Sequence, residues 1–216
     1  MNTVKLLSPR LIAVAIMATV SFSSYSQTLT SNKGVIINGI KWAICNVSAP
    51  GTFTDKPEDA GSLYQWNRKK GWAATGSVTG WDKSTPPDAT TESIWEKDNH
   101  WEKTNDPCPA GWHIPTLAEI KKLLDTDKVS NVWTTQNGVN GRKFTDRATG
   151  NAIFLPVAGY REANDGSLES AGEEGYYWSG TQGGGGRGYN IVLNNDKAYW
   201  DFDYRVYGFS IRPVAN

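Results

Sequence analysis

The stretch "GYYWSGTQGGGGRGYNIVLNN", residues 175–195, contains a G-x-G-x-x-G pattern in Gly183, Gly185 and Gly188. That pattern marks a dinucleotide-binding loop only where a strand precedes it and a helix follows it. Here the segment "YNIVLNN" follows, with β-branched residues in a strand pattern, and no Lys-Ser or Lys-Thr pair stands after the glycines. The sequence therefore predicts a glycine-rich connection between two strands and no phosphate-binding loop.

Short strand patterns surround this connection. "KAYWDFDY" and "YGFSIRPV" complete four strand candidates in the C-terminal part, and "GVIINGIKWAICNV" predicts a hairpin with its turn at Asn38-Gly39. Residues 129–161 read as further strands. Turns are expected there at Asn137-Gly138, Asn140-Gly141 and Gly150-Asn151.

One helix is predicted, at "IPTLAEIKKLL". Thr116 and Glu119 have the spacing of a capping box, in which the hydroxyl and the carboxylate satisfy each other's backbone N–H groups. Ile120, Leu123 and Leu124 then form one apolar stripe. Residues 49–106 are rich in Pro, Gly, Thr, Asp and Trp and predict long loops. One helix, many short strands and long loops predict an α+β domain with no parallel nucleotide-binding sheet.

The first 26 residues have the layout of a secretory signal peptide. Lys5 and Arg10 precede an apolar run that is too short to span a bilayer, and small residues follow it up to Ser26. We therefore expect signal peptide 1–26 and a single domain 27–216, exported to the periplasm, the cell surface or the medium. No later segment is apolar for long enough to cross a membrane.

The charge balance argues against nucleic acid as a partner. The chain has 22 basic and 22 acidic residues, and loss of Lys5 and Arg10 with the signal peptide leaves 20 against 22. Phosphate binding needs a clustered basic face, which the sequence lacks. Ten Trp, nine Tyr and six Phe are a heavy aromatic load for 216 residues. These rings must serve as core, as contact surface, or as both.

No catalytic or metal motif emerges from the residue spacing. His100 and His113 stand apart without the spacing of a zinc site, and Ser179 is not in a G-x-S-x-G elbow. Asp201 and Asp203 share one face of a strand, but calcium needs six to eight oxygens. We expect no enzyme activity, no cofactor and no metal, although several glutamates leave a glycosidase pair open.

Cys45 and Cys108 are the only cysteines. Export permits a disulfide between them, and two free thiols are the alternative.

The segments "NDPCPAGWHIPTLAEI", "FLPVAGYR", "GYYWSGTQ" and "YGFSIRPV" resemble the Fibrobacter succinogenes major paralogous domain family. "INGIKWAICNV", "GTFTDKPEDAGSLYQWNRKKGW" and "VWTTQNGVNGRKFTD" fit the same pattern, so the resemblance covers nearly all of residues 27–216. It implies a C-type-lectin-like fold with one capped helix, small twisted antiparallel sheets, long irregular loops and paired N- and C-terminal strands. The sugar- and calcium-binding motifs of true C-type lectins do not occur here.

The resemblance also bears on the cysteines and on function. Many relatives have a Cys where this chain has Pro213, which implies that Cys108 has exchanged that partner for Cys45. Some relatives stand at fimbrial tips or on the cell surface, and some lectin-like relatives diversify a C-terminal binding face. Lectin-like architecture does not by itself imply sugar binding.

These observations lead to one expected function and two alternatives. We expect an exported, non-enzymatic binding module, of the adhesin or fimbrial-tip type, for a protein or glycan ligand. Alternation in "KAYWDFDY" places Trp200 and Phe202 on one face and Tyr199, Asp201 and Asp203 on the other. We expect the first face to pack inward and the second to be displayed. The expected ligand-binding residues are Arg187, Tyr189, Tyr199, Asp201, Asp203, Tyr204 and Tyr207, a composition that resembles antibody binding loops. The alternatives are a structural subunit of a pilus or surface assembly, with pilus subunits as partners, and a glycan hydrolase.

Overall fold

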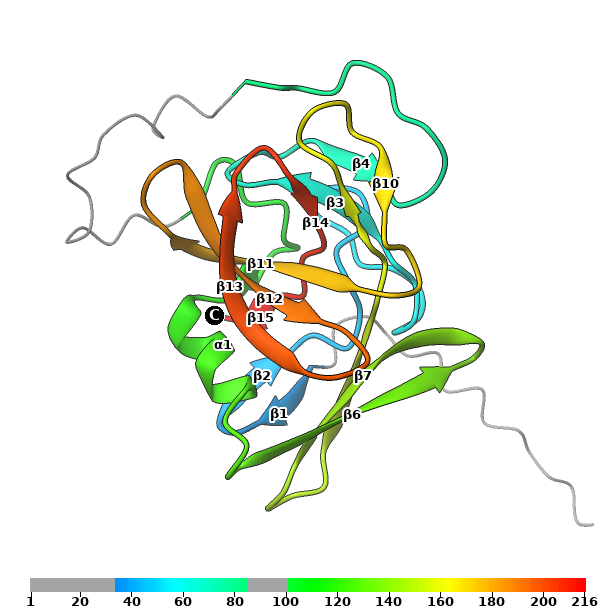
Figure 1. The fold of residues 1–216 in the computed structure, drawn as a ribbon. Helices are drawn as coiled ribbons and strands as arrows, with labels where there is room; N and C mark the ends of the chain where they lie inside the picture. Colours follow the sequence, from blue (N-terminus) through cyan, green and yellow to red (C-terminus); the bar gives the residue numbers. More distant parts are fainter. Residues whose placement is uncertain (1–33, 85–100) are drawn as a thin grey trace, which may run out of the picture.

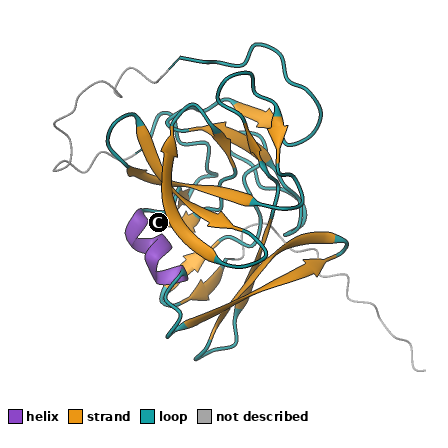
Figure 2. Cartoon of the chain, in the orientation of Figure 1, coloured by secondary structure: helices purple, strands orange, loops and turns teal. Residues whose placement is uncertain are grey.

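The computed structural model describes residues 34–84 and 101–216. These residues form one short helix, α1 (Leu117–Leu123), and four small antiparallel sheets, shown in Figure 1 and, by type of element, in Figure 2. The predicted combination of one helix with many short strands is confirmed, and the class is broadly α+β or mainly β. The predicted signal peptide, residues 1–26, and His100 lie outside the described residues.

The sheets join strands that are distant in sequence. Their strand orders are β1-β2-β15-β5, β10-β9-β14-β3-β4, β11-β12-β13 and β6-β7-β8. The strands are β1 (Val35–Ile37), β2 (Ile40–Trp42), β3 (Ser62–Gln65), β4 (Gly71–Ala73), β5 (Trp112–His113), β6 (Val129–Gln136), β7 (Val139–Asp146), β8 (Ala152–Pro156), β9 (Tyr160–Arg161), β10 (Leu168–Glu169), β11 (Gly175–Gln182), β12 (Arg187–Leu193), β13 (Ala198–Tyr204), β14 (Gly208–Phe209) and β15 (Val214–Ala215).

The predicted N-terminal hairpin is confirmed. Asn38 and Gly39 join β1 to β2 with φ of 45° and 78°, the two positive angles that a type I′ turn requires. Trp42 of this hairpin lies opposite Val35 on one side and Val214 of β15 on the other. The first and last strands of the described chain therefore share one sheet.

The capping box of α1 is also confirmed. The Glu119 backbone N–H donates to the Thr116 hydroxyl, and the Thr116 backbone N–H donates to Glu119 Oε2 at 2.8 Å. Ile120 and Leu123 are buried, and Leu124 packs against the same core. A helix of seven residues is marginal in isolation, so this packed stripe is what stabilises it.

One of the turns predicted for residues 129–161 is wrong. Asn137 and Gly138 form the β6–β7 turn as expected, with φ of 49° and 84°. Asn140 and Gly141, however, lie inside β7. A Cβ atom at Gly141 would come within 2.4 Å of the Leu155 carbonyl oxygen. The glycine there permits close approach of β8 and does not reverse the chain.

Two other glycine predictions are confirmed. Gly150 has φ of 74° between β7 and β8, where the Gly150-Asn151 turn was expected. The glycine-rich segment joins β11 to β12, with positive φ at residues 184–186. The Gly183 N–H donates to the Arg187 carbonyl at 2.9 Å. A strand follows this loop, so the context required for a dinucleotide site is absent.

Three of the four predicted C-terminal strands form as expected, as β11, β12 and β13. The fourth candidate, residues 207–214, divides instead between β14 and β15, which belong to different sheets. Its backbone therefore crosses from one sheet to another.

The β11-β12-β13 sheet lies between two apolar clusters. On one face Ile191 packs in a cluster that includes Ile120 of α1. On the other face Trp178 stacks on Phe209 with ring centroids 4.1 Å apart, in a cluster that includes Trp66. Figure 1 shows the curved β13 at the free edge of this sheet, with α1 beside it.

A fully buried arginine joins the two ends of the described chain. The Arg212 guanidinium donates to Asn46 Oδ1 at 2.8 Å and to the backbone carbonyls of Ala43, Ile44 and Pro57 at 3.3, 2.5 and 3.3 Å. Buried loop carbonyls without donors are costly. One rigid side chain therefore satisfies several of them at once.

Two more buried arginines act on other loops. Arg161 donates to the carbonyl of Ala73 at 3.0 and 2.7 Å and to that of Thr75 at 2.9 Å. The Arg205 guanidinium lies 4.0 Å from the ring centre of Trp66. The predicted loops are thus held by arginines as well as by aromatic rings.

Replacing Arg212 by lysine should destabilise the protein by about 3 kcal/mol, because one ammonium cannot reach the acceptors that the guanidinium fork serves. Urea unfolding of R212K and the parent protein measures this difference. Arg147 is exposed and donates to the Thr126 carbonyl, so R147K is the control and should change stability by less than about 0.5 kcal/mol. Equal midpoints for the parent and R212K would contradict this role.

Candidate functional site

An exposed aromatic surface lies on the sheet face that α1 covers only in part. We call it the outer aromatic face; its residues are Arg187, Tyr189, Trp200, Phe202 and Tyr204. Residues opposite each other in β12 and β13 share a face, and Tyr189 lies opposite Phe202 and Arg187 opposite Tyr204. Trp200, Phe202 and Tyr204 are 43%, 41% and 51% exposed.

Contacts within this face order its side chains. Tyr189 meets Trp200 and Phe202 edge to face, at centroid distances of 5.8 and 6.0 Å. The Arg187 guanidinium lies 4.6 Å from the ring centre of Tyr204 and donates to its hydroxyl at 3.1 Å. Lys121 of α1 places its ammonium 4.9 Å from the Trp200 ring centre. The face therefore presents ordered rings flanked by two cations.

The predicted orientation of β13 is wrong. Trp200 and Phe202 were expected to pack inward, yet they are exposed, and Asp201 and Asp203 are half-buried on the opposite face. The cause lies in β12. A Cβ atom at Gly188 would come within 2.4 Å of Trp66 Cδ1, so the face that contains Gly188 is the one packed against the buried indole.

The structure divides the predicted ligand-binding residues between two places. Arg187, Tyr189 and Tyr204 lie on the outer aromatic face. Tyr199, Asp201 and Asp203 share the opposite face of β13. Tyr207 follows β13 and lines a small cavity together with Asp203.

Trp200 and Phe202 are surface residues that the sequence pattern did not identify. Alternation in β13 separates two sets of side chains but does not say which set faces the core. The signal that could have oriented the strand is Gly188 in the paired strand, where the absence of a side chain admits Trp66.

Asp201 and Asp203 share one face, as predicted, but each has an internal partner. Asp201 Oδ1 accepts from the Phe202 N–H at 2.9 Å, and Asp203 Oδ2 accepts from Asn190 Nδ2 at 2.9 Å. Within residues 34–84 and 101–216, no group of three or more His, Cys, Asp or Glu side chains is placed to hold a metal ion.

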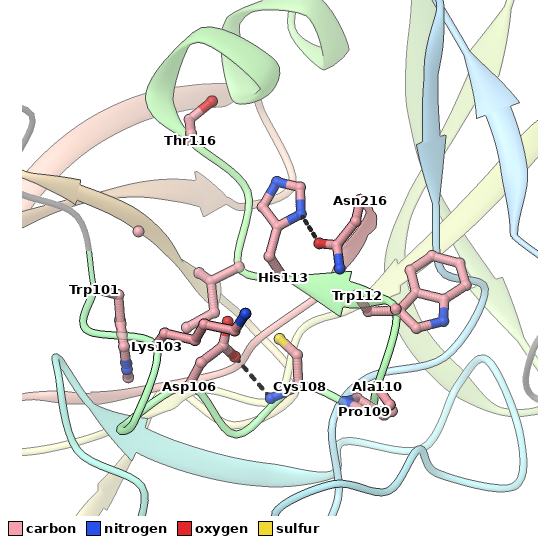
Figure 3. A pocket seen from close by; sticks show the side chains of 13 residues that line it. Trp101, Lys103, Asp106, Cys108, Pro109, Ala110, Trp112, His113, Thr116 and Asn216 are labelled. Carbon is pink, nitrogen blue, oxygen red and sulfur yellow. Dashed lines mark hydrogen bonds between the residues drawn. The ribbon is translucent and has the colours of Figure 1, made fainter.

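A second, larger cavity has a volume of about 700 Å³ and is lined by residues that include Trp101, Lys103, Asp106, Cys108 and His113. Figure 3 shows the His113 ring directed at Asn216, and His113 Nδ1 lies 2.8 Å from Asn216 Oδ1. His113 Nε2 lies 3.4 Å from Glu119 Oε2. Both ring nitrogens therefore have partners other than Cys108.

The chemistry of this cavity does not favour a thiol nucleophile. Burial raises the pKa of the Cys108 thiol well above its ordinary value, and the neighbouring Asp106 carboxylate raises it further. A reactive cysteine needs the opposite surroundings, with a lowered pKa and a base in contact. The Glu119 carboxylate accepts a hydrogen bond from the His113 ring and thereby raises the pKa of His113, so His113 is linked to the capping box of α1.

Cys45 and Cys108 are both free in this structure, which is the second of the two alternatives that the sequence left open. Cys45 is buried, where its thiol is under the influence of Arg212 and Thr54. Cys108 lines the large cavity beside Asp106. The two sulfurs belong to different surroundings.

Because the hydrogen bond that His113 donates to Glu119 raises the pKa of His113 above 6.5, the charged ring should stabilise the fold below pH 6.5. This contribution is lost as pH rises through the folded pKa. Burial raises the pKa of Glu119, but hydrogen bonds from His113 and Thr116 outweigh it and hold the pKa below 4.5. The Glu119 contribution is therefore lost at lower pH.

At about pH 5.5, H113Q should thus be less stable than the parent by up to about 1 kcal/mol. At about pH 8.5 the two proteins should have nearly the same stability. Urea unfolding at the two pH values measures the difference. A gap that widens with increasing pH would contradict the His113–Glu119 pairing.

Two free thiols predict that a reducing agent leaves the melting temperature unchanged. Unfolding in iodoacetamide without reductant should add two carbamidomethyl groups, which intact-mass spectrometry counts. Alkylation of the folded protein should be slow at Cys108, since burial raises the pKa of this thiol. Alkylation of the two cysteines only after reduction would show that they form a disulfide and would contradict this prediction.

Within the described part of the chain, no helix has the length and apolar character that crossing a membrane requires. In comparisons with protein-family models, curated proteins and solved structures, nothing matches this chain.

Proposed function

We propose that this chain is an exported, non-enzymatic binding module of the adhesin or fimbrial-tip type, which binds a protein ligand through the outer aromatic face. The observation that supports this most is the exposure of Trp200, Phe202 and Tyr204 side by side on one strand. Contiguous exposed apolar side chains on a folded domain mark interaction surfaces more often than isolated ones do.

The composition of the face favours a protein partner over a glycan. Trp, Tyr and Arg are the residues most enriched among those that dominate the binding energy of protein interfaces. Here Trp200, Tyr189 and Arg187 lie within one cluster, and ring and cation contacts already order them. Side chains ordered before binding lose less conformational entropy on complex formation.

The side chains of β13, more than its free backbone edge, are the expected contact. β13 is at the edge of its sheet, and exposed edges invite strand addition. The Phe202 N–H, however, donates to its neighbour Asp201, and the Tyr204 carbonyl accepts from the Tyr207 N–H. These internal bonds occupy part of the edge and leave the rings available.

The C-type-lectin-like fold is part of the proposal. It is supported by the pairing of β2 with β15 near the two ends of the chain, by a single capped helix and by loops held through buried arginines. Export is expected from the signal-peptide layout of residues 1–26.

A W200A/F202A/Y204A variant should lose at least about tenfold in affinity for target cells, because truncation removes three contiguous interface rings. These side chains are 41–51% exposed, so the melting temperature should change little. Flow cytometry of labelled protein on panels of bacterial and host cells measures the binding. The matched control is I36A/V132A, since Ile36 and Val132 are exposed apolar residues of other sheets, at 54% and 55%.

Protease treatment of the cells should abolish binding of the parent protein. Loss of binding after periodate but not after protease would make the ligand a glycan. Unchanged binding by the triple variant would overturn the site. Absence of cell binding, together with co-purification of the parent protein in polymers, would favour a structural surface subunit instead.

A further inference from the structure

A small aromatic cavity lies on the opposite side of the β11-β12-β13 sheet. Its volume is about 100 Å³. We call it the tyrosine pocket; its lining residues are Tyr160, Tyr176, Asp203, Tyr207 and Phe209. They come from β9, β11, β13, the segment after β13, and β14. All but Phe209 are partly exposed, so the pocket is accessible from solvent.

The rings form walls that meet nearly at right angles. Tyr160 is inclined by 70° to Tyr176, by 75° to Tyr207 and by 87° to Phe209, at centroid distances of 5.0, 5.7 and 6.3 Å. Tyr207 and Phe209 are nearly parallel, at 20°. A group in this corner would meet more than one aromatic ring.

Carboxylates surround these rings. The Tyr176 hydroxyl donates to Glu174 Oε2 at 2.8 Å. Burial raises the pKa of Tyr160, and the nearby charges of Glu162, Glu169 and Glu174 raise it further. These carboxylates favour a cation over a neutral or anionic ligand at the pocket.

Asp203 supplies a carboxylate within the pocket itself. Asn190 Nδ2 donates to it at 2.9 Å, while Asn190 Oδ1 is buried and has no hydrogen-bond partner among the described residues. Burial raises the pKa of Asp203, and Asp201 raises it further; Asn190 and Arg187 offset only part of this effect. Arg187 is engaged on the other face with Tyr204. A bound cation would stabilise this carboxylate.

We propose that the tyrosine pocket is a binding site for a quaternary or fully methylated alkylammonium group. Aromatic rings arranged around a carboxylate attract such a cation through their negative ring faces. A volume of about 100 Å³ is well below that of sites for drug-sized ligands, so the pocket receives one head group and not a whole sugar chain.

A primary ammonium fits this pocket less well. It is strongly hydrated and has three N–H donors to satisfy, whereas rings make up most of the lining. A quaternary ammonium has no such donors and loses little hydration. This site is independent of the outer aromatic face, because the two lie on opposite faces of β13.

The test is an NMR titration of the intact protein with choline, alongside 3,3-dimethylbutan-1-ol as its neutral isostere. We expect saturable shifts with choline at a dissociation constant on the order of 1 mM and none with the alcohol. Phosphocholine should bind more weakly than choline, because Glu162 and Glu174 repel its phosphate. D203N, which keeps an acceptor for Asn190, and Y207L should each weaken binding at least about tenfold.

F53L is the control for loss of an aromatic ring, because Phe53 packs against Trp112 and does not line the tyrosine pocket, and it should bind choline as the parent does. Melting curves of D203N show whether that variant is folded. Choline affinity of the parent should fall as pH is lowered toward the Asp203 pKa, which lies above 3.8. The proposal would be overturned if the shifts did not saturate at choline concentrations roughly tenfold above the expected dissociation constant. Equal binding of the neutral alcohol, or of phosphocholine as tightly as choline, would also overturn it.

Discussion

The buried Arg212 guanidinium links the segment before β15 to the long connection between β2 and β3. A domain built from long loops must bury backbone carbonyls that no regular sheet satisfies. Arg212 donates to carbonyls in two parts of the connection between β2 and β3, and it lies on the segment that leads into β15. Because it has no carboxylate partner among these contacts, its charge is stabilised by peptide dipoles and by the nearby Tyr177. The contacts join both ends of the described chain.

A second constraint is local: Gly188 determines which face of the β11-β12-β13 sheet packs against Trp66. The indole of Trp66 occupies the space that a side chain at residue 188 would fill. Trp66 is itself fixed by donating to the Ser179 carbonyl at 2.8 Å and by the Arg205 guanidinium above it. The face containing Gly188 therefore has one possible partner, and Trp200, Phe202 and Tyr204 are left on the other.

Local chemistry made part of this fold predictable from sequence. The Asn38-Gly39 turn and the Thr116/Glu119 capping box need only residues a few positions apart, and both were predicted correctly. The prediction of a turn at Asn140-Gly141 was wrong because Gly141 lies within β7, where it permits the close approach of β8. That contact is not visible in the local sequence. The predicted orientation of β13 was wrong for a similar reason, because it depends on the contact between Gly188 and Trp66. The tyrosine pocket is lined by five residues from five segments between Tyr160 and Phe209, so no short sequence motif predicts it.

The two candidate surfaces depend on one pairing register. Asp203 lies opposite Gly188, and Phe202 lies opposite Tyr189. A slip of β13 by one residue would exchange its two sets of side chains, since successive residues point to opposite faces. Aromatic rings would then meet Trp66, and carboxylates would meet solvent beside Arg187. The Gly188–Trp66 contact prevents this exchange by leaving no room over β12. The same contact that completes the core therefore separates the outer aromatic face from the acidic tyrosine pocket.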